Sequence, residues 1–315
     1  MRLLSFLTAG CMSVLLAACQ TVPPPVAQSP VPQARPAPAR PPAAAPSRES
    51  ASLALLYRRL EQRLLAQGLL RRDGGGPDTA FGARELARNF ERIALFSEYV
   101  QINGRYIPQQ SRAQLRRWED PVRIQLHFGA SVSDKMRRED TNRIHAYVAR
   151  LRRLTNHPIG LVTSGGNYHV FVVNLDEQRA LAPAIQAAEP ALGKSTVREL
   201  TQLDRSTYCA VFASSSSAAP NRYVSAIALI RTEHPDLMRL ACYHEEIAQG
   251  LGLANDSPEA RPSIFNDDEE FALLTRHDEL LLRMLYDRRL SVGQTADEAR
   301  PIIRQIAGEL AGGRT

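Results

Sequence analysis

From Trp118 onward, the sequence alternates between segments with the two-residue period of a β-strand and segments with the period of an amphipathic helix. Residues 122–128 alternate apolar and polar side chains, which predicts a half-buried strand. Residues 140–155 place their apolar side chains on one face of a predicted helix. Further strands are expected at residues 159–163, 169–175, 208–213 and 223–230, with the last two paired as a hairpin around residues 214–217. This alternation favours a fold of the α/β (α+β) class with a mixed sheet.

Apolar residues at helical spacing predict further helices on both sides of the strand segments. These helices are expected at residues 52–70, 83–99, 235–252, 278–286 and 296–310. They divide the folded part of the chain into a helical layer at 51–114, an α/β domain at 115–290 and a C-terminal helix at 291–315. The chain has 315 residues, of which 44% are hydrophobic, and this is enough for one or two domains with a core.

The first eighteen residues have the features of an export signal peptide. Arg2 precedes a largely apolar run at 3–18, which is too short to span a bilayer comfortably. The run ends in Leu-Ala-Ala-Cys at 16–19, which resembles the lipobox of bacterial lipoproteins. The resemblance implies cleavage before Cys19, lipid on its sulfur and acylation of its new amino group. Because Gln20 rather than Asp follows, it also implies the outer membrane, with the protein facing the periplasm. The alternative is a soluble secreted protein.

The segment after the lipobox is rich in proline. Ten of the twenty-five residues at 22–46 are Pro, and most of the others are Ala, Val or Gln. Such a composition cannot bury a core and predicts an extended, polyproline-like tether. Fully stretched at ~3.1 Å per residue, the tether would reach roughly 75 Å. The lipidated cysteine and the tether together occupy residues 19–50, so the folded part can lie well away from the membrane.

The chain contains four cysteines. Cys11 would leave with the signal peptide and Cys19 would carry lipid, so Cys209 and Cys242 remain in the mature protein. In an oxidising periplasm this pair is expected to form a disulfide, which would stabilise the fold by about 3 to 4 kcal/mol. The alternative is that both sulfurs bind a metal, but the sequence offers few further ligands at metal spacing.

The charge of the chain does not indicate a nucleic-acid-binding protein. The formal net charge of +6 is carried by 37 Arg and 2 Lys. The arginines are scattered along the chain, without the interleaved aromatic residues or the glycines of a nucleic-acid-binding module. We therefore expect no nucleic-acid partner. The charge is consistent with a modest, unspecific attraction to anionic polymers of the cell envelope.

The helix predicted at 235–252 carries the most informative group of side chains. Cys242, Glu245, Glu246 and Gln249 stand at positions i, i+3, i+4 and i+7, so all four lie on one helical face. Two carboxylates, a carboxamide and a sulfur on one face indicate a polar site next to a disulfide.

His244 and Glu245 look like the start of the zinc-binding sequence H-E-x-x-H, but Ala248 stands where the second histidine should be. The helical neighbours of His244 at i+4 and i+7 are Ala248 and Leu251, and neither can bind a metal. His244 is therefore expected to be a surface or capping histidine rather than a ligand.

A different register gives a match in spacing. The sequence Glu245-Glu246-x-x-Gln249-x-x-Gly252-x-x-Asn255 has the spacing of the metzincin motif H-E-x-x-H-x-x-G-x-x-H. The segments after the helix also resemble those of matrixin-like metzincins, at residues 263–265, 274–278 and 285–286. From about 115 to 290 the chain thus resembles a degenerate metzincin, a matrixin-like zincin. The whole chain also resembles a bacterial lipoprotein family defined as a domain of unknown function, which has the core E-E-x-x-Q-x-L-G-L-x-N-D.

The resemblance implies a zincin-like domain, in which a mixed sheet supports an active-site-type helix. Glu246 would keep the position of the general base, and Gly252 would form the turn. The three ligand positions would be taken by Glu245, Gln249 and Asn255. Carboxamide oxygens are poor, neutral ligands for zinc, so we do not expect standard zinc chemistry.

Two interpretations without zinc follow. In the first, Gln249 and Asn255 form a hydrogen-bond network that satisfies Glu245 and the turn, and the domain has a binding or scaffold role with no cofactor. In the second, Glu245, Gln249 and Asn255, with Asp256 or Asp267, bind calcium or another hard cation.

A third interpretation is a metal-dependent peptidase or other hydrolase. Glu246 would act as general base, and His244 or a non-histidine ligand set would bind zinc. We favour the first interpretation, an envelope lipoprotein with a binding or scaffold role. Its expected partners are the membrane, through the lipid anchor, and an envelope protein or peptidoglycan.

Overall fold

The computed structural model describes residues 44–102, 105–266 and 268–312. The predicted signal peptide at 1–18, the predicted lipidation site Cys19 and nearly all of the tether lie outside the described residues, as does Asp267. Among the described helices, none is both long enough and apolar enough to cross a membrane.

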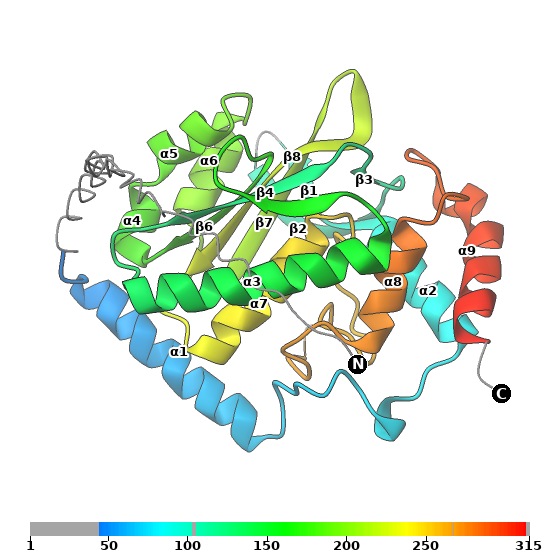
Figure 1. The fold of residues 1–315 in the computed structure, drawn as a ribbon, viewed down its shortest axis with the longest axis horizontal. Helices are drawn as coiled ribbons and strands as arrows, with labels where there is room; N and C mark the ends of the chain where they lie inside the picture. The colour runs from blue at the N-terminus through cyan, green and yellow to red at the C-terminus, as the bar shows by residue number, and fades with distance from the viewer. Residues whose placement is uncertain (1–43, 103–104, 267, 313–315) are drawn as a thin grey trace, which may run out of the picture. The chain divides into compact units, whose positions relative to one another are not determined.

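A six-stranded sheet forms the centre of the fold (Figure 1). Its strands are β3 (Arg117–Trp118), β4 (Val122–Phe128), β5 (Ile159–Val162), β6 (Tyr168–Val173), β7 (Cys209–Ser216) and β8 (Ala219–Arg231). Strands β5, β4, β6 and β8 are parallel neighbours in that order, and β3 adds in parallel to the start of β8. β7 lies antiparallel to β8. The predicted α/β class with a mixed sheet is confirmed.

β8 is buried on both faces of the sheet, which explains its continuous apolar sequence. Ala226, Ala228 and Ile230 belong to the larger hydrophobic core. Ile227 and Leu229 belong to a smaller core on the opposite face. Because successive strand residues point to opposite faces, one strand supplies both cores.

Helices cover both faces of the sheet (Figure 1). The helices on the larger core are α3 (Asp134–Thr155), α7 (Asp236–Gln249) and α8 (Arg276–Leu285). The helices on the smaller core are α5 (Ala182–Ala188) and α6 (Lys194–Thr201). α4 (Leu175–Arg179) precedes them, and its Leu175 packs in a separate cluster with Leu53 and Tyr57 of α1 (Arg48–Ala66). These three short helices were not predicted, because five to eight residues are too few to establish a helical period.

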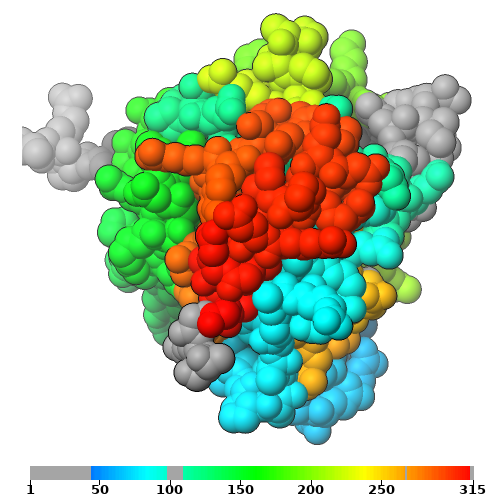
Figure 2. Space-filling model, turned by 90° about the vertical axis from the view of Figure 1, so that its right-hand side faces the viewer, coloured from blue at the N-terminus to red at the C-terminus, as the bar shows by residue number. Residues whose placement is uncertain are grey.

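The remaining elements come from the two ends of the described chain. They are α1 (Arg48–Ala66), the 3₁₀ helix η1 (Pro77–Thr79), α2 (Ala83–Ala94), β1 (Phe96–Ile102), β2 (Arg105–Arg112) and α9 (Ala296–Ala311). β1 and β2 form a separate antiparallel pair. α9 packs against α2, and Figure 2 shows this contact between the red and cyan segments.

Several expected boundaries were wrong: the helix predicted at 140–155 begins at Asp134, and the helix predicted at 52–70 ends at Ala66. The helix predicted at 83–99 ends at Ala94, and residues 96–112 form β1 and β2 instead. The aromatic and β-branched residues at 96–102 favour a strand, although apolar positions continue the helical spacing that precedes them. In the hairpin, β7 continues through Ser216, so the connection is shorter than the predicted loop at 214–217.

Candidate functional site

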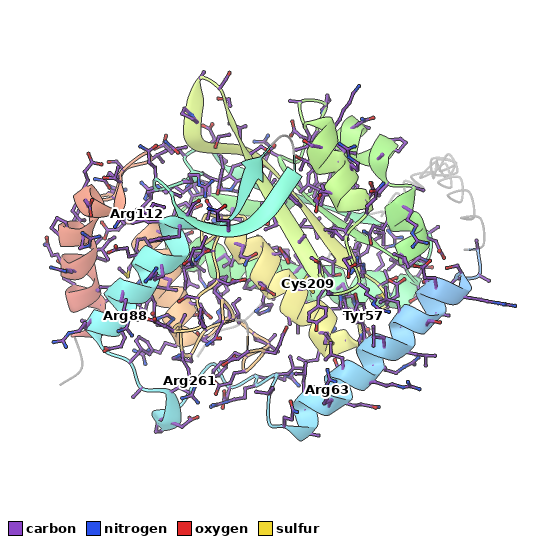
Figure 3. The ribbon with its side chains drawn as sticks, turned by 180° about the vertical axis from the view of Figure 1, so that it is seen from behind. Tyr57, Arg63, Arg88, Arg112, Cys209 and Arg261 are labelled. Carbon is purple, nitrogen blue, oxygen red and sulfur yellow. A yellow bond between two sulfur atoms is a disulfide. The ribbon has the colours of Figure 1, made fainter. Side chains whose placement is uncertain are left out.

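A cleft of about 540 Å³ lies between the sheet edge at β7 and the helix α7. Figure 3 shows Cys209, the first residue of β7, close to α7. The charged and carboxamide side chains that line the cleft are Arg116, Glu199, Glu246, Gln249 and Asp256. The cleft therefore combines the edge of a sheet with three carboxylates and one guanidinium.

The backbone of β7 offers hydrogen-bonding groups to this cleft. The N–H groups of Ala226 and Thr232 in and after β8 donate toward β6, at 3.0 and 2.9 Å, so even-numbered residues of β8 face β6. Odd-numbered residues of β8 therefore face β7, and their partners in β7 are even-numbered. It follows that Cys209, Val211 and Ala213 direct their N–H and C=O groups away from β8, toward the edge of the sheet at which no other described strand pairs.

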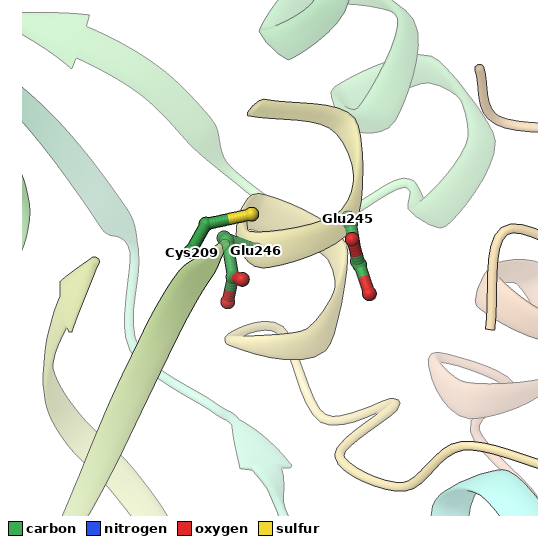
Figure 4. A group of neighbouring side chains, drawn as sticks. All are labelled: Cys209, Glu245 and Glu246. Atoms are coloured by element: carbon green, nitrogen blue, oxygen red, sulfur yellow. The ribbon is translucent and has the colours of Figure 1, made fainter. Parts of the chain in front are cut away.

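Glu246 lies on the face of α7 that is turned to β7, beside Cys209 (Figure 4). Its side chain is buried, with the residue 3% exposed. The Tyr168 hydroxyl donates to the Glu246 carbonyl at 2.6 Å, and burial raises the pKa of Tyr168 well above its usual range. Trp118 Nε1 donates to the Gly250 carbonyl at 2.8 Å. These two bonds fix the last turn of α7 against the sheet.

The turn after α7 carries the other predicted site residues. Gln249 Nε2 donates to Asp256 Oδ1 at 3.0 Å, so these two cleft-lining side chains are joined. Asn255 is 1% exposed, and its Nδ2 donates to the Arg92 carbonyl at 2.9 Å and to the Asp256 carbonyl at 2.7 Å. Asn255 therefore ties the turn to α2.

Gly252 has a φ of +130°, a backbone conformation that residues other than glycine rarely adopt. A Cβ at this position would lie 2.4 Å from the Arg116 carbonyl oxygen. The close approach holds Arg116 at the cleft, where its Nη2 donates to Ser97 Oγ at 2.6 Å. Because it has no side chain, Gly252 lets the turn after α7 pack closely against the backbone of Arg116.

The predicted disulfide between Cys209 and Cys242 is confirmed, with a Cα–Cα distance of 5.9 Å. It joins the start of β7 to the middle of α7, so it ties together the two elements that form the walls of the cleft. The alternative in which both sulfurs bind a metal is wrong, because a disulfide sulfur is not a thiolate.

The cleft residues do not fit a zinc ion. One ligand atom each of Cys209, Glu245 and Glu246 lie within 4.8 Å of one another (Figure 4). The disulfide removes Cys209 from this group, which leaves two carboxylates, whereas a zinc site uses at least three protein ligands. Of the described residues at the three predicted ligand positions, only Gln249 lines the cleft. The calcium interpretation stays a prediction.

His244 is buried, not at the surface as expected. It is 8% exposed, its ring stacks on Tyr147 at 4.0 Å, and its Nδ1 accepts from the Leu274 N–H at 3.0 Å. Burial, with a smaller effect of Arg150, lowers the pKa of His244 to about 3. His244 is therefore a neutral core histidine that holds the segment before α8.

This burial predicts a loss of stability in acid. Burial also lowers the pKa of His234 to about 4, whereas an unfolded histidine titrates near 6.5. Between pH 6.5 and about 4 the unfolded chain takes up protons that the folded chain refuses, so the free energy of unfolding falls as the pH falls. Denaturation at several pH values should show a shallower fall in a His234→Gln/His244→Gln variant. An unchanged pH dependence would contradict this assignment.

Arg116, Glu199 and three residues of the segment at 203–207 also line the cleft and were not predicted from the sequence; the three are Leu203, Ser206 and Thr207. The segment is held by Arg231, which is fully buried and donates to the carbonyls of Leu203, Asp204 and Thr207. The sequence did contain one indication of this segment, an arginine at the end of the apolar run of β8. A buried guanidinium needs hydrogen-bond acceptors, so another segment must supply them.

Residues 83–305 match a family model described as a protein of unknown function, DUF2927. The match begins at the start of α2 and ends within α9, so it contains the whole cleft. No curated protein and no solved structure matches the chain.

Proposed function

Because this family model covers more than half of it, the chain belongs to the DUF2927 family, and we propose that this member is an envelope lipoprotein whose β7–α7 cleft binds an extended polypeptide without zinc chemistry. The lipobox-like sequence ending at Cys19 supports a lipid anchor, and Gln20 supports the outer membrane. The proline-rich tether would give the folded part reach into the periplasm, toward a segment of an envelope protein.

We also propose that the domain is zincin-like, and the order of its elements supports this. β4, α3, β5, β6, the β7–β8 hairpin and α7 occur in the order that the resemblance to metzincins leads us to expect, with α4, α5 and α6 inserted between β6 and β7. α7 carries Glu245, Glu246 and Gln249, as the active-site-type helix would. The positive φ of Gly252 agrees with the turn position of the motif.

The observation that carries the binding role is the outer edge of β7, which pairs with no other described strand and lies along a cleft. An extended polypeptide can pair with Cys209, Val211 and Ala213 through its backbone, as a strand added to the sheet. Backbone pairing of this kind gives affinity, and side chains entering the cleft give specificity.

The charges of the cleft indicate which side chains it prefers. Glu199, Glu246 and Asp256 line it, and Arg116 is the one cation among the described residues of the lining. Opposite charges across an interface favour the correct partner and its register. We therefore propose that the bound segment carries a Lys or Arg side chain beside these carboxylates.

The test replaces Val211 with Pro. A proline at this position removes an N–H group that faces the cleft, and it leaves the ladder with β8 intact. A decapeptide selected from a random phage-displayed library is expected to bind the Val211→Pro variant at least tenfold more weakly, as measured by fluorescence anisotropy. Val211→Ala keeps the N–H group and is the matched control, with affinity near that of the wild type.

Failure of the library to yield any peptide would contradict the proposal. So would a peptide that binds wild type and Val211→Pro equally, because its binding would not use the edge of β7. Thermal unfolding of each variant checks that the β7–β8 pair remains formed.

Glu246 favours a second candidate function, a metal-dependent peptidase or other hydrolase. Its carboxylate lines the cleft, and in the metzincin-like register of the sequence it stands at the position of the residue that polarises water. Such an enzyme should copurify with a stoichiometric transition metal and lose hydrolysis on Glu246→Gln. Elemental analysis of protein expressed in the periplasm separates the two candidates, and absence of bound zinc after zinc loading would exclude a zinc enzyme.

A further inference from the structure

A larger groove, of about 860 Å³, lies between α2 and α9, on the side of the molecule where Figure 2 shows these two helices in contact. Its lining includes six arginines: Arg84, Arg88 and Arg92 from α2, Arg112 from the end of β2, and Arg300 and Arg304 from α9. Figure 3 labels Arg88 on α2 and Arg112 near α9. We call this the arginine groove.

The arginines form two rows along the helices. Arg84, Arg88 and Arg92 are spaced by four residues, so they lie on one face of α2 and span about 12 Å along its axis. Arg300 and Arg304 are spaced in the same way on α9, about 6 Å apart. Because both rows line one groove, their guanidinium groups can reach a ligand between the helices.

The carboxylates near the groove neutralise only part of this charge. Glu91 accepts from Arg300 Nη2 at 2.7 Å and from its Nε at 3.0 Å. Asp297 lies 3.6 Å from Arg112 Nη1, and Glu259 lies 3.5 Å from Arg88 Nε.

The other three arginines keep their charge available. Within the part of the chain that the structure describes, Arg84, Arg92 and Arg304 form no ion pair with a carboxylate, and all three are exposed. The groove therefore presents an excess of positive charge.

The groove also has an apolar part. Ala87, Phe96 and Ile303 line it between the arginines. The Arg92 guanidinium lies 5.2 Å from the centre of the Phe96 ring, a cation–π contact that holds Arg92 at the groove. The groove can thus bind a molecule that has an apolar part as well as negatively charged groups.

We propose that the arginine groove binds a ligand that carries two or more phosphate groups. Guanidinium groups pair with phosphate oxygens through two parallel hydrogen bonds, and one phosphate accepts from several arginines. The two rows of arginines extend over a longer distance than a single phosphate group occupies. One phosphate group can therefore be bound at each row at the same time. A soluble oligophosphate and the headgroup of a phosphorylated lipid share this chemistry.

The experiment measures binding of inorganic tripolyphosphate by calorimetry, and of vesicles containing cardiolipin, whose headgroup carries two phosphates, by sedimentation. Both use the full chain. We expect at least one probe to bind, and an Arg84→Gln/Arg92→Gln/Arg304→Gln variant to bind it about tenfold more weakly. The matched control, Arg58→Gln/Arg59→Gln/Arg63→Gln, removes the same charge from the exposed surface of α1 and should stay close to the wild type.

A second variant tests the opposite sign. Glu91→Gln removes one of the two carboxylates that hold Arg300, since Asp297 also accepts from Arg300 Nη1 at 2.7 Å, so the probe should bind about threefold more tightly. Binding of tripolyphosphate alone assigns a soluble ligand, and binding of vesicles alone assigns a lipid headgroup. The proposal is overturned if neither probe binds, or if the α1 control loses as much affinity as the groove variant, since binding would then follow net charge.

Discussion

Removal of the Cys209–Cys242 disulfide is expected to lower the free energy of unfolding by about 4 kcal/mol. The bond closes a loop with a sequence separation of 33, and its main effect is to restrict the unfolded chain. It also joins β7 to α7, so its loss should weaken binding of an extended peptide in the cleft. Denaturant titration of a Cys209→Ala/Cys242→Ala variant measures the first effect, and anisotropy measures the second.

Reducing agent provides the control for this prediction. It should bring the wild type down to the stability of the double variant and leave the double variant unchanged. A loss below about 1 kcal/mol would mean that the closed loop is already ordered in the unfolded chain, contrary to our expectation.

Replacement of Asp140 with Ala is expected to cost about 3 kcal/mol. Asp140 accepts from Arg239 Nε at 2.8 Å and from the Tyr243 hydroxyl at 2.9 Å, and the side chains of the ion pair are 1% and 2% exposed. Without Asp140, the buried Arg239 would keep Asp236 as its one ionic partner among the described residues, at 2.8 Å. The decrease in the free energy of unfolding should be at the lower end of the range for buried ion pairs, because Asp236 still pairs with Arg239.

An exposed ion pair of similar geometry is the matched control for Asp140. Arg289 donates to both carboxylate oxygens of Glu309 at 2.8 Å, but these side chains are 37% and 50% exposed. Glu309→Ala should cost about 0 to 1 kcal/mol. Equal losses from the two variants in chemical denaturation would show that burial of the Asp140 pair contributes little.

The parts of the fold that could be predicted from the sequence are those with a long, regular period. β4 could be identified because apolar and polar residues alternate along 122–128. β8 could be identified from the apolar run within 223–230. Phe96 is a different case, because it continues the helical spacing of α2 and also begins β1. Local spacing cannot decide between these two structures, since pairing with a distant strand determines the outcome.

The candidate site was predicted in part. Glu246 and Gln249 line the cleft, and the helical face that they share was visible from their spacing. The role of Asn255 was not visible, because it depends on the Arg92 carbonyl, which lies 163 residues earlier in the chain. The arginine groove was also missed, because its two rows are far apart in the sequence and each row looks like a solvated helix face.

Phe96 and Ser97 are consecutive residues of β1, yet Phe96 lines the arginine groove and Ser97 lines the cleft. Since neighbouring residues of a strand point to opposite faces, a single strand separates the two sites. Arg92 adds a second connection, because its side chain lies at the groove and its carbonyl holds the turn of the cleft through Asn255. A ligand that shifts this segment from one side is therefore expected to change affinity on the other, and thermodynamic reciprocity requires the same factor in both directions.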